Sequence, residues 1–501
     1  MSGPSARPRR GLVLGARNRL SGLDRRSLGV TDVVAHSVAV MAPCAAGATI
    51  PMLVMEAGAS LVWSVLGAVV LAGLVAIVLR EFASRMAAPG GLYTFAAKGL
   101  GPVGGIVTAI AMVLGYGALG VFALSQSAFF TLSLLGRDHP SSIEVGLAVI
   151  VLGAAIAATL VRGIRLSSRV GLITEAVAVT VVLAAIAVLL TRHSASLDPA
   201  SIVAAPSSVG SLCVGIAIAT CGLIGFESAT TVSVEAQRPL RVVPAAIIVS
   251  LFLGALVVLI ATVAQAAGTS VLAAVSALSD GNFDVMADSV GAGWVVPIIN
   301  VGIIASFVAC TLATTTSLAR TLMSLAREGI VDHRLGRTRP RFKTPAVAIL
   351  ASVAVMSVVA AGAAMFGGSA EAVRSSMAAT PSIGFITAYI VVGIACPLFL
   401  RRTGESRPGI TVIAVTATGL FGAVLVVFVV ISFGTDRAGG VIAALCWYVV
   451  SAVGALALWR ARPWVVARVG IHETPVRADV WRGHRRPEDA TLAGPRHSGP
   501  T

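Results

Sequence analysis

Twelve apolar segments divide most of the chain, and each is about as long as the 20 or so residues that a helix needs to cross a bilayer. Over the 501 residues, 56% are hydrophobic and only 12% are charged, which is too apolar for a soluble protein of this size. The sequence therefore predicts an all-α polytopic membrane protein with 12 transmembrane helices. The predicted spans are 28–55, 58–80, 102–135, 143–161, 170–191, 207–232, 243–266, 294–320, 345–366, 376–400, 410–433 and 438–459.

The basic residues lie on one side of this pattern. If the N-terminus is cytoplasmic, only four of the 37 Lys and Arg fall in connections on the opposite side, namely Arg137, Arg192, Arg374 and Arg437. Cytoplasmic loops are enriched in Lys and Arg, so the bias predicts a multi-pass protein of the plasma (inner) membrane with both termini cytoplasmic. The net charge of +15 is thereby explained as a topology signal, and nucleic acid is not an expected partner.

The first span is interrupted. It carries Pro43, Gly47 and Pro51 near its middle, and a proline inside a helix removes a backbone donor and clashes with the preceding turn. We expect this helix to unwind near residues 44–47.

The sixth span is interrupted as well. Residues 207–244 combine an apolar run with Gly210, Gly215, Gly222 and Gly225, followed by Glu227 at membrane depth. Glycine lets the backbone leave the helix, and an ionisable side chain in hydrocarbon usually marks a substrate path or a proton relay. This stretch predicts a second broken helix that forms half of a substrate site.

The two breaks are spaced as a repeat would place them. Gly47 and Gly225 lie 178 residues apart, which is the length of five spans. Two units of five spans run oppositely through the membrane and predict an inverted-repeat transporter. The predicted organisation is a cytoplasmic arm (1–27), a permease domain (28–460) with repeat one (28–191), repeat two (207–400) and extra helices (410–459), and a disordered cytoplasmic tail (461–501).

Broken helices offer two kinds of binding group. The half-helix that starts at a break presents free N–H groups and partial positive charge, which suit a carboxylate. The half that ends there presents carbonyls, which suit an ammonium group. A zwitterion of amino-acid size satisfies both, whereas kinks that serve only packing remain the alternative explanation of each break taken alone.

Three segments carry a resemblance to a known family. They are GFESATTVSVEAQRPLRVVPAAI (225–247), SLARTLMSLAREGIVDHRLGRTRPRFKTP (317–345) and EFASRMAAPGGLYTFAAKGLGPVGG (81–105). Together they resemble the sixth helix, the eighth helix with its loop, and the re-entrant segment of the amino acid–polyamine–organocation (APC) superfamily of permeases. The resemblance covers nearly all of residues 28–460. It implies a LeuT-like fold, a five-plus-five inverted repeat with discontinuous helices 1 and 6, and alternating access to a central site.

The resemblance also places a substrate site. The break that holds the substrate carboxylate in the family falls on a segment where alanine replaces most of the usual glycine and serine, which removes a hydroxyl. The implied substrate-binding residues are Cys44, Ala45, Ala46 and Gly47 of the first span, Tyr116 and Ala118 of the third, Cys221, Gly222, Ile224 and Gly225 of the sixth, and Thr314 of the eighth.

Coupling residues are expected beside this site. Relatives that couple to protons use a fifth-helix lysine, but here the fifth span has Glu175 instead. The candidates for carrying a proton or gating the site are therefore Glu227, Glu175 and His36. Sodium is the weaker alternative, with Thr314 and Thr315 as hydroxyl ligands and Thr311 on the same wall.

The leading hypothesis is a secondary transporter of amino acids or related amines, working by proton symport or exchange. A polyamine carrier and a non-transporting membrane sensor stay open as alternatives. An enzyme is not expected, because the seven histidines form no catalytic cluster with acids. No metal or cofactor is expected, since the six cysteines lack ligand spacing and no phosphate-binding loop is present.

Overall fold

A computed structural model describes residues 22–56, 60–137, 140–162, 164–192, 205–267, 294–339, 342–367, 370–467 and 469–470. Most of the predicted arm (1–27) and most of the predicted tail (461–501) lie outside these residues. The first half comprises α1 (Val30–Met41), α2 (Pro43–Glu56), α3 (Leu61–Ala83), α4 (Leu92–Leu100), α5 (Pro102–Leu134), α6 (Ser142–Val161) and α7 (Ile164–Arg192). The second half comprises α9 (Val209–Cys221), η1 (Phe226–Thr230), η2 (Ser233–Glu235), α10 (Pro239–Ala267), α13 (Val295–Glu328), η3 (His333–Gly336), α14 (Ala346–Phe366) and α15 (Ala370–Arg402). The chain continues through α16 (Pro408–Ser432), α17 (Ala438–Ala461) and α18 (Pro463–Val466).

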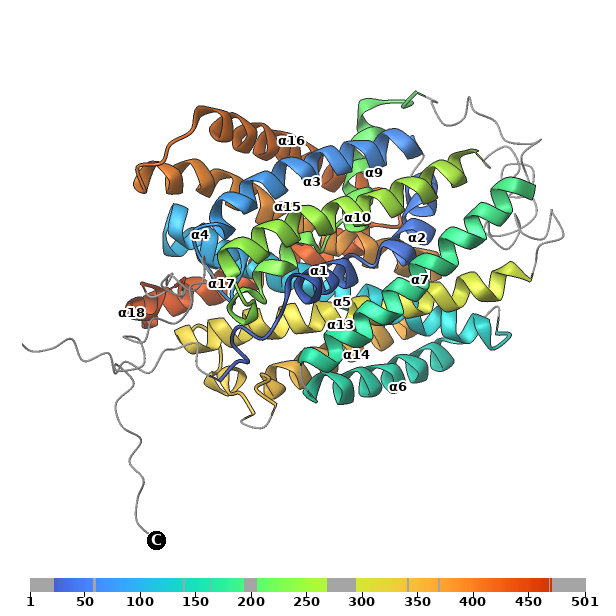
Figure 1. The fold of residues 1–501 in the computed structure, drawn as a ribbon, viewed down its shortest axis with the longest axis horizontal. Coiled ribbons are helices and arrows are strands. Elements are labelled where there is room, and N and C mark those ends of the chain that lie inside the picture. Colours follow the sequence, from blue (N-terminus) through green and yellow to red (C-terminus); the bar gives the residue numbers. More distant parts are fainter. Residues whose placement is uncertain are drawn as a thin grey trace, which may run out of the picture.

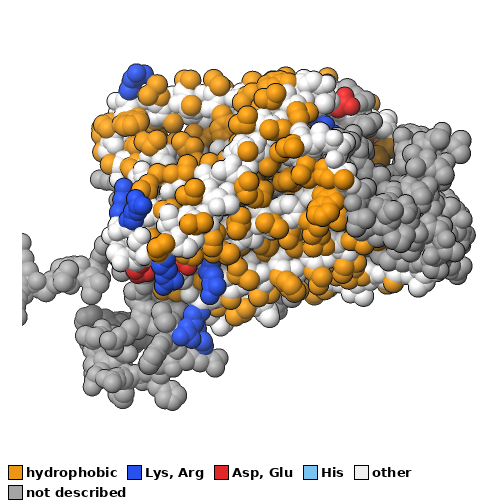
Figure 2. All heavy atoms as spheres, turned by 90° about the horizontal axis from the view of Figure 1, so that it is seen from above, with side chains coloured by type: hydrophobic (Ala, Val, Ile, Leu, Met, Phe, Trp, Pro, Cys, Tyr) orange, Lys and Arg blue, Asp and Glu red, His pale blue; other side chains and the backbone are white. Residues whose placement is uncertain are grey.

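The helices have the length and surface of membrane spans. In the described part of the chain, ten helices are long and apolar enough to cross a bilayer, and the apolar stretches of α7 and α9 are shorter. Figure 2 shows hydrophobic side chains over most of one face, with most visible Lys and Arg gathered at one end. At that end α4 and α18 lie in Figure 1, and we call it the basic end. The protein is a multi-pass, all-helical membrane protein.

The first span breaks at Ala42. This residue adopts left-handed angles (φ 46°, ψ 58°) between α1 and α2. Proline disfavours helical angles in the residue before it and is well tolerated at the first helical position, so Pro43 ends α1 and starts α2. The expected unwinding at residues 44–47 is corrected accordingly: those residues form the first turns of α2.

The second break lies at the predicted place. Helix α9 ends at Cys221, and a turn over residues 222–225 leads into η1. Gly225 has φ 138°, which a residue with a side chain rarely adopts. The chain then passes through η2 and resumes as α10.

The broken segments lie at the centre of the molecule (Figure 1), where α1 packs against α7, α10, α13 and η1. Helix α5 packs along α13 and α15. Helix α3 also contacts α10, and α6 contacts α14. The site residues are thus held between helices that are far apart in sequence.

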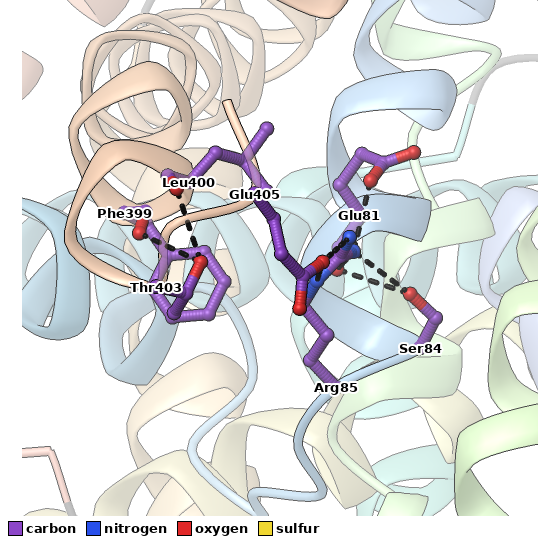
Figure 3. Close-up of polar contacts among 7 residues, drawn as sticks. All are labelled: Glu81, Ser84, Arg85, Phe399, Leu400, Thr403 and Glu405. Carbon is purple, nitrogen blue, oxygen red and sulfur yellow. Dashed lines mark hydrogen bonds and ion pairs between the residues drawn. The ribbon is translucent and has the colours of Figure 1, made fainter. Parts of the chain in front are cut away.

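The basic end is tied together by polar contacts. Figure 3 shows Arg85, just after α3, between Glu81 and Glu405, with N–O distances of 2.8 and 2.5 Å. The backbone N–H of Gly470 donates to the Glu328 carboxylate on α13, and the Tyr93 hydroxyl on α4 donates to the same oxygen. The first residues of the predicted tail are therefore packed against the bundle rather than free of it.

Candidate functional site

The two breaks touch each other. A Cβ atom added to Gly225 would lie 2.5 Å from the Met41 backbone nitrogen and 2.9 Å from the Val40 carbonyl carbon. One added to Gly222 would lie 2.9 Å from Ile50 and 3.3 Å from Ala46. The sixth span therefore approaches the first through glycines, because only the absence of side chains allows the backbones so close.

Glu227 is the centre of this contact. It is fully buried in η1. One carboxylate oxygen accepts from the Tyr116 hydroxyl of α5 (3.2 Å), and the other accepts from the Tyr389 hydroxyl of α15 (3.0 Å) and the Gly225 N–H (2.9 Å). Such hydrogen bonds to a charged acceptor are stronger than neutral ones. One carboxylate thus joins the second break to two surrounding helices.

The start of α2 has a second buried acid beside it. The Cys44 N–H donates to a carboxylate oxygen of Glu175 on α7 (3.4 Å), and the Ala45 N–H donates to the Ser306 hydroxyl on α13 (3.2 Å). Ser306 in turn donates to the same Glu175 oxygen (3.1 Å). A negative charge at a helix start is favourable, because the helix dipole is positive there.

The wall of α13 contributes to the end of α1. The Cys310 thiol donates to the Val40 carbonyl (3.1 Å) and lies 3.6 Å from the Thr314 hydroxyl. Thr311 donates to a carbonyl of its own helix (2.9 Å), and Thr315 contacts the Met356 sulfur (3.6 Å). Of the three predicted threonines on α13, Thr314 is the one that is linked to the first break, through Cys310.

The remaining predicted residues fall into two groups. Cys221 and Ile224 are buried at the second break, next to Gly222 and Gly225. Gly47 instead faces α10, where the Gln265 amide donates to its carbonyl (2.7 Å). Gly47 therefore lies inside α2, and its backbone is not part of the break. Ala118 is partly buried in the middle of α5, two residues after Tyr116 and therefore on a different face of the helix.

His36 belongs to a polar chain on the basic side of the breaks, and this chain meets the Glu227 cluster where Ser317 hydrogen-bonds Tyr116. Its Nε2 lies 3.1 Å from the Ser317 hydroxyl of α13, and the Thr231 hydroxyl donates to the same oxygen (3.2 Å). The Ser228 hydroxyl also donates to Ser37 across to α1 (3.4 Å). These contacts close the space between α1, α13 and the segment after η1.

A buried ion pair follows one turn further along α13. Arg320 donates through Nε and a terminal nitrogen to one oxygen of Glu235, both at 2.7 Å, and the two side chains are only 3% and 1% exposed. Leu28 runs beside Ala236 and exchanges backbone hydrogen bonds with its neighbours, Glu235 and Gln237. The Glu235–Arg320 pair therefore closes the basic end from inside.

Sequence reasoning missed Tyr389, Ser306, Ser317, Cys310 and Arg320. Each becomes a neighbour of a predicted residue only through helix packing. One signal was available for Tyr389: the chain has only four tyrosines, and two of them bind Glu227. The serines and Cys310 gave no signal, because such residues are common inside transmembrane helices.

Comparison with known proteins identifies the family. The family model described as amino acid permease matches residues 28–457. The chain belongs to this family. It is 24% identical over 416 residues to the branched-chain amino acid permease BcaP of Bacillus subtilis, covering 78% of this chain and 83% of that protein. It is 26% identical over 368 residues to cationic amino acid transporter 4 of Mus musculus, covering 69% of this chain and 55% of that protein.

Solved structures show the same fold. The chain is similar to the crystal structure of a manganese transporter of Eremococcus coleocola, with a TM-score of 0.53 and 15% identity over 87% of this chain and 95% of that one. An uncharacterised transporter of Mycobacterium tuberculosis is 27% identical over 343 residues, or 68% of this chain and 74% of that protein.

The contact between the breaks predicts a severe effect of Gly225→Ala. The left-handed backbone alone costs about 1–3 kcal/mol for a residue with a side chain, and the new Cβ meets backbone atoms that cannot rotate away. We expect a large loss of thermal stability of the purified protein in detergent. The control is Gly73→Ala in α3, where a Cβ meets nothing within 4 Å; it should be neutral or stabilising by about 0.5–1 kcal/mol. Equal effects of the two variants would contradict this account of Gly225.

The Glu235–Arg320 pair predicts a distinctive double-mutant result. Glu235→Gln leaves Arg320 buried without its charge partner, which should cost about 3–5 kcal/mol of folding free energy. Replacing both residues by apolar ones of similar size should restore much of that loss. The control is Glu405→Gln, which breaks a half-exposed pair and should cost at most about 1 kcal/mol. Thermal unfolding of Glu235→Gln, the double variant and Glu405→Gln checks these values. A double variant that is less stable than Glu235→Gln would show that the two charges are not coupled.

Proposed function

We propose that this permease is a secondary transporter that carries amino acids across the plasma membrane by alternating access, coupled to protons by symport or exchange. The observation that carries the proposal is the meeting of two broken helices at Gly225, with the buried carboxylate of Glu227 beside it. Interrupted helices at a repeat interface are where secondary transporters bind substrate and coupling ion. The proposed arrangement has 12 spans, two inverted repeats and both termini in the cytoplasm.

The proposed substrate site lies around these breaks. Its backbone groups are the N–H groups that begin α2 and the carbonyls that end α1, which would take the carboxylate and the ammonium of an amino acid. Its walls are the predicted residues of the first, third, sixth and eighth spans. Cys44, Ala45, Ala46 and Cys221 are small and buried, which leaves room for an apolar side chain. The name of the Bacillus subtilis relative supports testing branched-chain amino acids first.

The proposed gating role of Glu227 follows from its partners. Tyr116 and Tyr389 come from α5 and α15, so the three residues hold the sixth-span break against two other helices. Movement of η1 away from them would strip the carboxylate of its donors, and a buried charge without partners is costly. Protonation removes that cost, which links the position of η1 to a proton.

The proposed closed end is the basic one. His36 with Ser317, and Glu235 with Arg320, join α1 and η2 to α13 between the breaks and that end. Alternating access requires these contacts to separate when the site opens toward the cytoplasm. The Glu235–Arg320 pair is suited to this, because its two charges are re-solvated when they part.

Uptake by purified protein in liposomes tests the proposal. A panel of labelled amino acids and amines, starting with leucine, isoleucine, valine, arginine and lysine, is screened with and without an inward proton gradient. We expect saturable uptake of at least one amino acid, accelerated by the gradient. Glu227→Gln should weaken the response to the gradient, because its amide cannot take up the proton that we link to the position of η1.

Glu405→Gln is the matched control, since it also replaces a carboxylate by an amide but lies at the periphery. Its uptake should equal that of the wild type. If folded protein gives neither uptake nor counterflow of any amine-bearing solute, the transporter proposal is wrong and a sensor role takes its place. Gradient-driven uptake in Glu227→Gln that equals that of the wild type would remove this residue from coupling.

A further inference from the structure

The start of α2 has only two backbone N–H groups to offer a ligand. Pro43 has no N–H, and the N–H of Ala46 donates to the carbonyl of Ala42. The groups without a helical partner are therefore those of Cys44 and Ala45. A substrate carboxylate that binds at this helix start has to use these two donors.

Both donors are already engaged by side chains of the protein. Cys44 donates to Glu175 and Ala45 donates to Ser306, which itself donates to Glu175. Glu175 is 3% exposed. Its second carboxylate oxygen, Oε2, has no hydrogen-bond partner among the described residues. A buried carboxylate thus lies at the start of α2, where a bound anion would lie, and only one of its two oxygens accepts hydrogen bonds from the described residues.

No described basic side chain pairs with Glu175. The ionisable groups that face it are the thiols of Cys44 on α2 and Cys310 on α13. Helices α1, α6 and α10 also pack on α7, and within the described residues they present no ionisable group to Glu175. The charge of Glu175 is therefore balanced by the N–H of Cys44, the hydroxyl of Ser306 and the helix dipole, and by no counter-ion among the described residues.

We propose that Glu175 is a built-in anion at the start of α2, which the substrate carboxylate displaces and which takes up one proton when it is displaced. Two carboxylates cannot share two N–H groups while both are charged, because like charges in a buried site repel strongly. Glu175 then keeps Ser306 as its hydrogen-bond partner and binds a proton from the water on the side that the site faces. On release of substrate, Glu175 returns to the N–H groups and the proton leaves.

This inference rests on the proposed function. It predicts that ligands with a carboxylate take up a proton on binding and that ligands without one do not. An amino acid brings a carboxylate, so its binding is accompanied by about one proton. The amine that lacks only this carboxylate leaves Glu175 in place, so its binding takes up none. The probe pairs are L-leucine with 3-methylbutylamine and L-arginine with agmatine, and the uptake screen shows which pair to use.

Calorimetric titration of the full-length protein in buffers of different ionisation enthalpy measures the proton uptake. For the wild type we expect about one proton with the amino acid, none with its amine, and a Kd for the amino acid that rises about tenfold per pH unit once Glu175 is ionised. Glu175→Gln should bind the amino acid with no proton uptake and with a Kd that no longer follows pH. Glu405→Gln should behave as the wild type.

The comparison of amino acid with amine needs no variant, so it decides the matter even if Glu175→Gln does not fold. Equal proton uptake for the two probes would overturn the displacement. Uptake that persists in Glu175→Gln and vanishes in Glu227→Gln would assign the proton to Glu227, leaving the transporter proposal intact. Binding of none of the four probes, together with no transport, would refute the proposed function and this inference together.

Discussion

A helix that breaks inside a bilayer exposes backbone N–H and C=O groups that lipid cannot satisfy, so the protein itself has to supply their partners. The centre of this permease is organised by that requirement. At the first break the free N–H groups are taken by Glu175 and Ser306, and a carbonyl by Cys310. At the second, Glu227 takes the N–H of Gly225. Helices α7 and α13, which carry Glu175, Ser306 and Cys310, pack against α1 and α2 and so bring these partners to the first break.

The same requirement explains why the buried acids differ from one another. Glu235 has a full counter-ion in Arg320, so its charge is balanced by a contact that closes the basic end. Glu227 has three neutral donors and no counter-ion among the described residues. Glu175 has two donors at one oxygen and, within the described part of the chain, none at the other. The acids that lack a counter-ion are those whose protonation can follow a change in their surroundings.

The sequence predicted the helical architecture and the two breaks, because span length, proline and glycine are local signals. It misplaced the first break by a few residues, because Pro43 disfavours helical angles at Ala42 and so sets the break there, while Gly47 stays helical. The sequence could not reveal the residues that complete the site. Ser306 and Tyr389 contact the breaks only because α13 and α15 pack against them. Glu175 was found as an isolated acid in a span, but its contact with the start of α2 depends on packing across 131 residues of sequence.

One departure from the family pattern becomes intelligible through this packing. The first span has alanine and cysteine where the resemblance leads one to expect glycine and a serine hydroxyl. In the structure a hydroxyl reaches the same backbone from α13, where Ser306 accepts from Ala45. The lost side chain of the first span is thus replaced from another helix, together with a carboxylate from α7. Because the side chains that bind the start of α2 come from two other helices, any movement of α7 or α13 relative to α2 changes these contacts directly. Substrate preference in this chain is therefore expected to depend on α7 and α13 as much as on the first span.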